Sequence, residues 1–219
     1  TENAYYLSHF NPCVLGPVYG GAYQWTREFI LRNIEVVMAP RRDDPLGAHV
    51  FYGNYPRRNR AIASVMKVYP AVRFGNNDYK TRTDLENFQE WCTHKSHWIF
   101  PVLGGLPLRG YNAMIIGGVP ILPSFLRNFP EVSILGDLPL YYETADLIDP
   151  VAITEAAARK FDAMGPGGLL QRVLDGLDRY HVDARCGHIL RLVQAAVLRI
   201  RVSDRSYPDG YYGLSSPAR

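Results

Sequence analysis

Residues 98–124, WIFPVLGGLPLRGYNAMIIGGVPILPS, decide the fold class of this chain. An apolar run ends in two glycines, a periodic segment carrying Arg109 and Asn112 follows, and two more glycines precede a second apolar run. The pattern predicts a strand, a helix and a strand, with Gly117 and Gly118 just past the helix end, where glycine is favoured. Strands that alternate with helices in this way are typical of a parallel α/β sheet.

The flanking sequence continues this alternation. We expect strands at residues 4–10, 34–39, 48–52, 71–74, 98–103, 119–122 and 138–142, and helices at residues 22–32, 58–68, 85–93 and 108–116. After residue 150 the chain is mainly helical, with predicted helices at residues 152–164, 169–180 and 188–202. The fold class predicted is therefore α/β, with a Rossmann-like, mainly parallel sheet flanked by helices and a helical C-terminal segment.

Four parts follow from this order. Residues 1–46 form a reduced strand–helix–strand unit, which ends in a polar turn, RRDDPL, interpreted as a linker. Residues 47–150 form the Rossmann-like domain, and residues 151–202 form the C-terminal helices. Residues 203–219 form a tail rich in Tyr, Gly, Pro and Ser, which we expect to be loosely ordered.

The composition excludes some classes of function. The chain has 219 residues, of which 47% are hydrophobic, enough for an ordinary buried core. A net charge of +3, from 24 basic and 21 acidic residues, argues against a nucleic-acid coat but permits a local basic patch for phosphates. Three separated cysteines without a CxxC pair predict no zinc site and fit a reducing, cytoplasmic compartment.

Several common motifs are missing from the sequence. No apolar stretch approaches the length of a membrane span and the first residues carry no signal-peptide pattern, so we expect no transmembrane segment. There is no P-loop, no G-x-G-x-x-G and no G-x-S-x-G. No DxD motif stands between strands, so we expect neither a metal nor a bound cofactor.

Residues 49–62, HVFYGNYPRRNRAI, are the first candidate binding segment. A predicted strand runs into Gly53, and Arg57, Arg58 and Arg60 follow at the start of a helix. A helix N-terminus offers free N–H groups and partial positive charge, and arginine adds a permanently charged, bidentate donor. The segment therefore suits a diphosphate. The alternative is a basic turn that only faces water.

The second candidate segment lies within residues 98–124. Gly104 and Gly105 allow close approach of the backbone to a ligand. Arg109 and Asn112 are three residues apart and share a helix face near that loop. Asn112 could donate hydrogen bonds to ribose hydroxyls or a phosphate. The alternative is that this strand–helix–strand unit only builds the core.

These two segments resemble the donor-binding domain of GT-B-type glycosyltransferases, in exostosin-like and related families. The run RGYNAMIIGGVPIL is similar to their donor-site signature, except that Asn112 stands where the signature usually has Glu. The upstream FYGNYPRRNRAI resembles the basic turn that meets the donor diphosphate, and the resemblance gives that role to Arg58 or Arg60. By the same resemblance the position of Asn112 contacts the nucleotide ribose. We expect Asn112, with Arg109 and the Gly104–Gly105 loop, to hold the nucleoside or the sugar, and the ring of Tyr111 could stack on a base or a sugar.

The N-terminal segment YYLSHFNPCVLGPVYGGAYQW resembles the opening of a GT-B acceptor domain. His9 stands at the end of the predicted first strand and is the candidate catalytic base, because imidazole exchanges protons near neutral pH. The alternative is a structural histidine. Only about forty-five residues precede the predicted linker, so a partner subunit in a homo-oligomer could complete the acceptor side.

The resemblance implies metal-independent transfer of a sugar from a nucleotide-sugar donor to a glycan or other hydroxyl acceptor. Two alternatives stay open. One is a non-catalytic module that binds a nucleotide-sugar or a glycan. The other is a nucleic-acid-associated protein that binds phosphates through its arginines or glycosylates a DNA base; its candidates are Arg41, Arg42, Arg57, Arg58 and Arg60.

Overall fold

The structure is a computed structural model, and it describes residues 21–47, 49–70, 82–102, 105–133, 135–143 and 149–197. Three short strands form one parallel sheet, in the order β1 (Ser96–Trp98), β2 (Val119–Pro123) and β3 (Leu140–Tyr142). Helix α6 (Leu108–Ile115) connects β1 to β2. The α/β class and the parallel sheet that the sequence predicts are confirmed. The three described strands do not, however, establish a Rossmann fold specifically.

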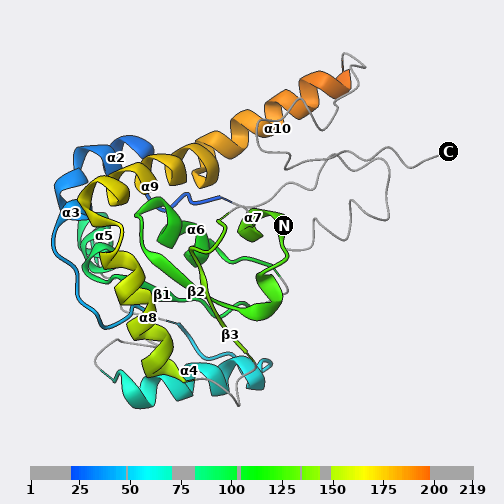
Figure 1. The fold of residues 1–219 in the computed structure, drawn as a ribbon. Helices are drawn as coiled ribbons and strands as arrows, with labels where there is room; N and C mark the ends of the chain where they lie inside the picture. Colours follow the sequence, from blue (N-terminus) through cyan, green and yellow to red (C-terminus); the bar gives the residue numbers. More distant parts are fainter. Residues whose placement is uncertain are drawn as a thin grey trace.

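Helices cover both faces of the sheet (Figure 1). Side chains alternate between the faces, as the period of a strand requires. Trp98 and Ile121 pack into one core with residues of α4 and α8, whereas Ile99 and Leu122 pack into the other core with residues of α6 and α9. The bounds of these covering helices are α4 (Pro56–Val68), α8 (Pro150–Asp162) and α9 (Gly165–Tyr180).

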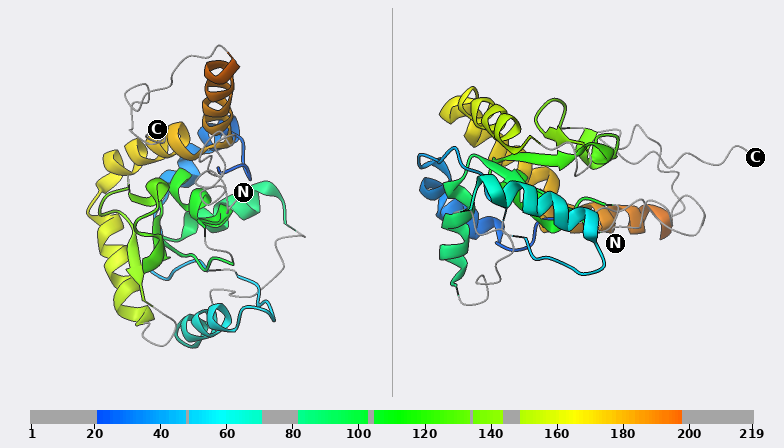
Figure 2. Two further views of the ribbon diagram at one scale, coloured as in Figure 1. Left: turned by 90° about the vertical axis from the view of Figure 1, so that its right-hand side faces the viewer. Right: turned by 90° about the horizontal axis from the view of Figure 1, so that it is seen from below.

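The remaining helical segments of the described chain are α2 (Arg27–Arg32), α3 (Ile34–Met38), α5 (Asp84–Thr93), η2 (Ser124–Leu126), α7 (Pro130–Ser133) and α10 (Val182–Val197). Helix α10 projects away from the sheet and its covering helices (Figures 1 and 2). A span of the bilayer needs about 20 apolar residues, and no helix in the described ranges combines such length with such apolarity.

Several elements form close to where the sequence predicts them, because local signals define their ends. Thr83 and Glu86 make a capping box at the start of α5. Gly117 follows α6 with φ of 74°, a conformation that glycine adopts without strain. Strands β2 and β3 and helix α4 also lie within a few residues of their predicted ranges. The predicted strands at residues 4–10 and 71–74 and the tail 203–219 lie outside the described residues.

Two predicted strands are wrong in the described chain, and the strand predicted at residues 98–103 is displaced, since β1 covers Ser96–Trp98. Where a strand is predicted at residues 34–39, helix α3 (Ile34–Met38) forms instead. Val37 is buried in the core, and Ile34 and Met38 pack beside it at helical spacing, so tertiary packing outweighs the β-branched run. Residues 49–52 are not in a strand. A half-buried strand would bury every second apolar side chain. Here His49 is buried instead, while Phe51 and Tyr52 are exposed.

Residues 41–46, interpreted as a linker, lie along the sheet. Arg42 and Leu46 form isolated parallel bridges to His94 and His97 beside β1. The guanidinium of Arg41 is buried and donates to the carbonyl oxygens of Val37 and Ile116 at 3.0 and 2.7 Å. The segment therefore ties α3 to the end of α6.

Candidate functional site

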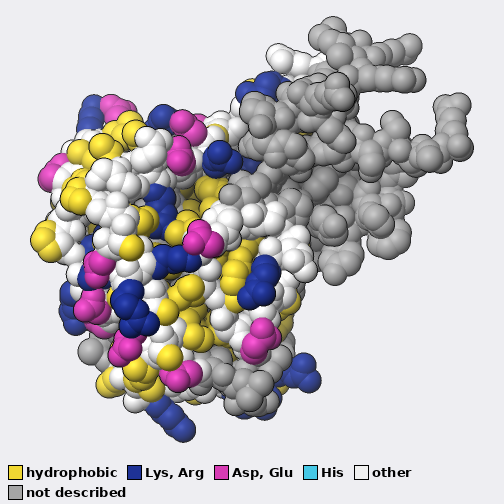
Figure 3. Space-filling view, viewed as in Figure 1, with side chains coloured by type: hydrophobic (Ala, Val, Ile, Leu, Met, Phe, Trp, Pro, Cys, Tyr) yellow, Lys and Arg dark blue, Asp and Glu magenta, His cyan; other side chains and the backbone are white. Residues whose placement is uncertain are grey.

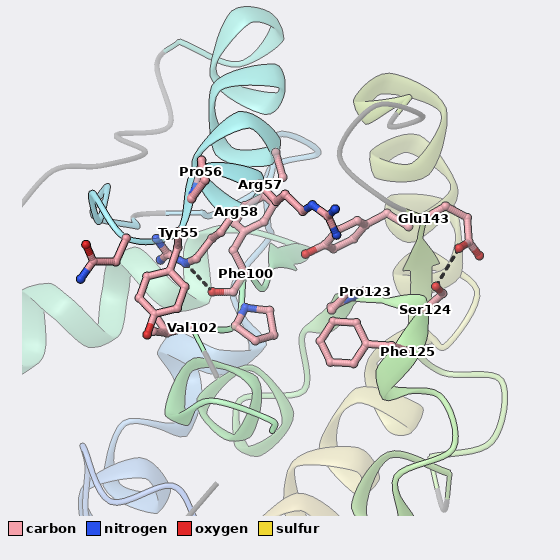
Figure 4. A pocket seen from close by; sticks show the side chains of 14 residues that line it. Tyr55, Pro56, Arg57, Arg58, Phe100, Val102, Pro123, Ser124, Phe125 and Glu143 are labelled. Atoms are coloured by element: carbon pink, nitrogen blue, oxygen red, sulfur yellow. Dashed lines mark hydrogen bonds between the residues drawn. The ribbon is translucent and has the colours of Figure 1, made fainter. Parts of the chain in front are cut away.

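A cavity of about 610 Å³ opens at the carboxyl ends of the three parallel strands (Figure 4). Its walls come from the residues that follow β1, from the ends of β2 and β3, and from the first turn of α4. In open α/β sheets, ligands bind in this position, beyond the carboxyl edge of the strands. The cavity is therefore the candidate functional site of the described chain.

The walls of the cavity are mainly apolar and aromatic. Tyr55 comes from the start of α4, Phe100 follows β1, and Phe125 follows β2. Prolines 101 and 123 add rigid apolar surface. Such walls accept a flat ring, because an aromatic ring gains both apolar burial and ring–ring contact.

Polar side chains also line the cavity, among them Arg57, Ser124 and Glu143 (Figure 4). Ser124 directly follows β2 and Glu143 directly follows β3, so neighbouring parallel strands bring them together. The hydroxyl of Ser124 donates a hydrogen bond to Oε2 of Glu143 at 2.8 Å. The sequence analysis missed both residues, although each is the first polar residue after an apolar strand.

Arg57 and Arg58 are neighbours in α4 but have different environments. Arg57 is exposed and forms no hydrogen bond or ion pair with the part of the chain that the structure describes. Arg58 is half-buried and donates to the carbonyl oxygens of Val50 at 2.6 Å and Phe100 at 3.0 Å. It also lies over the ring of Tyr52, 4.9 Å from the centroid. Arg57 is the arginine that can reach a ligand, while Arg58 holds the cavity wall.

His49 lies behind Arg58 and is buried. Its Nε2 is 2.8 Å from the carbonyl oxygen of Trp98, and a carbonyl can only accept, so Nε2 carries the proton. Its Nδ1 then accepts from Nη2 of Arg58 at 3.4 Å. Burial, followed by the charge of Arg109, lowers the pKa of His49 well below its ordinary value. The neutral ring therefore supports Arg58 without repelling it.

The start of α4 adds polarity to the cavity. Tyr55 is its N-cap and makes no side-chain capping bond, and Pro56 occupies the first helical position. Pro56 has no backbone N–H, so the N–H groups of Arg57 and Arg58 are those of the first turn that the helix itself does not use. They and the helix dipole favour an anion at the cavity mouth beside Arg57.

The other residues expected to bind a donor lie elsewhere. Asn112 and Tyr111 are both buried in α6 and do not line the cavity. Nδ2 of Asn112 donates to Oε1 of Gln24 at 2.7 Å, and Tyr111 packs against Tyr180. Arg109 lies over the ring of Trp91, 5.8 Å from the centroid.

Five further candidate residues also lie outside the cavity lining or outside the described residues. Arg60 is exposed on α4 outside the cavity lining, and Gly53 is exposed with open space around its Cα. Gly105 is buried and does not line the cavity. Gly104 and His9 lie outside the described residues. The structure thus brings Arg58 to the cavity, but it does not bring the α6 residues there.

A metal centre finds no support in the described ranges, since they hold no group of three or more His, Cys, Asp or Glu side chains that could bind an ion. Comparison with known proteins gave no match to a protein-family model, to a curated protein or to a solved structure. The functional argument therefore depends on the cavity itself.

Proposed function

We propose that the cavity binds a nucleotide-sugar and that the protein transfers the sugar to a hydroxyl acceptor without a metal. One observation carries the proposal: an aromatic-walled cavity of about 610 Å³ lies where three parallel strands end and α4 begins. That position suits a ligand with both a flat ring and an anionic group. The resemblance of residues 49–62 and 109–122 to a donor-binding domain supplies the reaction.

The walls suggest how the donor lies. The diphosphate takes the position beside Arg57 and the first turn of α4, where the arginine charge and the positive end of the helix dipole favour an anion. The base packs against Tyr55, Phe100 and Phe125. Arg57 then stabilises the charge that builds on the leaving diphosphate, which is usually the largest contribution to such catalysis. Arg57 takes the role that the resemblance gives to Arg58 or Arg60.

The contacts of the arginines and the mixed surface charge argue against a nucleic-acid partner. Arg41 and Arg58 already donate to backbone carbonyl oxygens, so their guanidinium groups are engaged within the protein. On the face drawn in Figure 3, basic and acidic side chains are interspersed and form no continuous basic field. Duplex binding needs such a field, because phosphate contacts supply most of its affinity.

Two secondary expectations accompany the proposal. A cytoplasmic location suits the thiols, since Cys92 is buried and unbridged and burial raises its pKa to about 12. A homo-oligomer would place a second subunit at the open side of the cavity and complete the acceptor site. Sedimentation at several protein concentrations measures that association.

The test is a thermal-shift and calorimetry screen with UDP-, GDP-, TDP- and CMP-sugars. A ligand that binds only the folded chain raises its melting temperature. Arg57→Ala should weaken binding of the best ligand about tenfold, because it removes a charge-assisted contact. Arg60→Ala is the matched control on the same helix and should leave the affinity within about twofold, since Arg60 does not line the cavity.

The possible results separate the proposals. If none of these sugar nucleotides stabilises the wild type, or if both variants bind equally well, the donor site is not this cavity. Binding without release or transfer of sugar would instead make the protein a non-catalytic nucleotide-sugar module.

A further inference from the structure

Glu143 occupies a chemically distinct place in the cavity. Among the described residues that line it, Glu143 is the one carboxylate. It follows β3 directly, while Ser124 follows the adjacent β2, so both residues line the cavity from the carboxyl edge of the sheet (Figure 4). Glu143 lines the same cavity as Arg57, which we assign to the anionic part of the ligand.

The contact with Ser124 orients this carboxylate. The Ser124 hydroxyl donates to Oε2 at 2.8 Å. The second oxygen, Oε1, accepts no hydrogen bond from any residue that the structure describes. One oxygen is therefore held in place, and the other is available to a hydroxyl group of a ligand.

Other groups at the cavity are unsuited to accepting a proton. The hydroxyl of Tyr142 donates to the carbonyl oxygen of Ile99 at 3.0 Å, and burial raises its pKa. His49 has both ring nitrogens engaged and lies behind Arg58. Arg57 and Arg58 are cations. Among the described residues that line the cavity, Glu143 is therefore the side chain best suited to accept a proton.

We infer that Glu143 is the catalytic base that removes the proton from the attacking hydroxyl, and that Ser124 is its positioning residue. This inference rests on the proposed sugar transfer. The acceptor oxygen forms a bond to the anomeric carbon as the bond from that carbon to the diphosphate oxygen breaks. The electron pair of the broken bond leaves with the nucleotide, a nucleoside diphosphate for UDP-, GDP- or TDP-sugars and CMP for CMP-sugars, and the acceptor proton moves to Oε1 of Glu143.

The experiment uses the full chain and the sugar nucleotide from the UDP, GDP, TDP and CMP series that binds best. Water serves as the acceptor, so release of free sugar and of the nucleotide (UDP, GDP, TDP or CMP) is the readout. Glu143→Gln keeps an oxygen that accepts from Ser124 but cannot take up the proton. It should bind within about threefold of the wild type yet release sugar about 10²- to 10⁴-fold more slowly.

A pH profile separates a base from a merely structural carboxylate. The wild-type rate should fall on acidification, because a protonated carboxyl group cannot accept the proton, and Glu143→Gln should lose this dependence. Ser124→Ala should slow release about threefold to tenfold, and Ser124→Thr, which keeps the hydroxyl, should restore most of the rate. Glu35→Gln is the charge-matched control, because Glu35 is exposed on α3 outside the cavity lining.

The outcomes distinguish the two ideas. Failure of the wild type to bind any sugar nucleotide defeats the proposed function. Binding with equal sugar release by Glu143→Gln and wild type overturns the assignment of the base alone. Binding by a wild type that releases no sugar also overturns it, since water is itself a hydroxyl acceptor.

Discussion

Nε of Arg58 donates a hydrogen bond to the carbonyl oxygen of Phe100 at 3.0 Å. Through Nη1 the same guanidinium reaches the carbonyl oxygen of Val50 at 2.6 Å. One side chain therefore fastens the start of α4 to the segment after β1, and together these two pieces form a wall of the cavity. Burial lowers the pKa of Arg58, but its ordinary value is so high that the cation persists at neutral pH.

Arg58→Ala should destabilise the fold by about 2–3 kcal/mol, since it deprives two carbonyl oxygens of a charged donor. Arg57→Ala, one residue earlier in α4, should change the free energy of unfolding by less than about 0.5 kcal/mol, because that side chain is exposed. Urea unfolding of the three proteins measures both effects. Equal stability losses in the two variants would contradict the distinction between a structural and a ligand-binding arginine.

A second arginine pair tests the segment at residues 41–46. Arg41→Met should cost about 2–3 kcal/mol, because the carbonyl oxygens of Val37 and Ile116 lose a buried donor. Burial lowers the pKa of Arg41 to about 10, so the side chain is still charged at neutral pH. Arg42→Met removes only an exposed ion pair with Asp44 and should cost about 0–1 kcal/mol.

Denaturant titration of both variants gives this comparison directly. If Arg41→Met were as stable as Arg42→Met, the segment would be a linker that carries little of the fold, as the polar sequence RRDDPL indicates.

The sequence predicts best where local signals agree with the tertiary environment. Helix α5 has its capping box at Thr83, α6 has glycines at its end, and β2 is apolar throughout, so their type and range are predicted closely. Residues 34–39 show the opposite case. Their β-branched run predicts a strand, but Val37 is buried on a helical face, which only the packing of the whole chain decides.

The cavity could be predicted only in part. The basic turn at the start of α4 is visible in the sequence, whereas Ser124 and Glu143 meet only because β2 and β3 are neighbours in the sheet. The sequence predicts that Asn112 is accessible to a ligand because it is polar. In the structure its side chain points into the protein and donates a hydrogen bond to Gln24. Which face of a short, largely buried helix points to a ligand is not encoded in its local spacing.

Two glycines of α9 allow a matched test of close packing. A Cβ at Gly176 would lie 2.6 Å from the carbonyl oxygen of Met114 and 3.1 Å from Cα of Ile115. Gly176→Ala should therefore push α9 away from α6 and destabilise the fold by about 1–3 kcal/mol. A Cβ at Gly167 would meet nothing within 4 Å. Gly167→Ala should be neutral or stabilise by up to about 1 kcal/mol, because alanine favours helix.

Thermal and urea unfolding of the two alanine variants provide the measurement. A stable Gly176→Ala protein would mean that α6 and α9 can separate slightly at no cost, contrary to the close contact of their backbones.

Buried histidines should make the fold sensitive to acid. Burial lowers the pKa values of His49 and His97 well below the ordinary 6.5. The unfolded chain then takes up protons first, so stability is complete above about pH 6.5 and falls as the pH falls. Each histidine should lower the free energy of unfolding by about 1.4 kcal/mol at about pH 5.5. Urea unfolding measures the fall in the free energy of unfolding between about pH 7.5 and 5.5, and His49→Gln should make that fall smaller by the contribution of one histidine. If the variant and the wild type lose equal stability, His49 is not a source of the acid sensitivity.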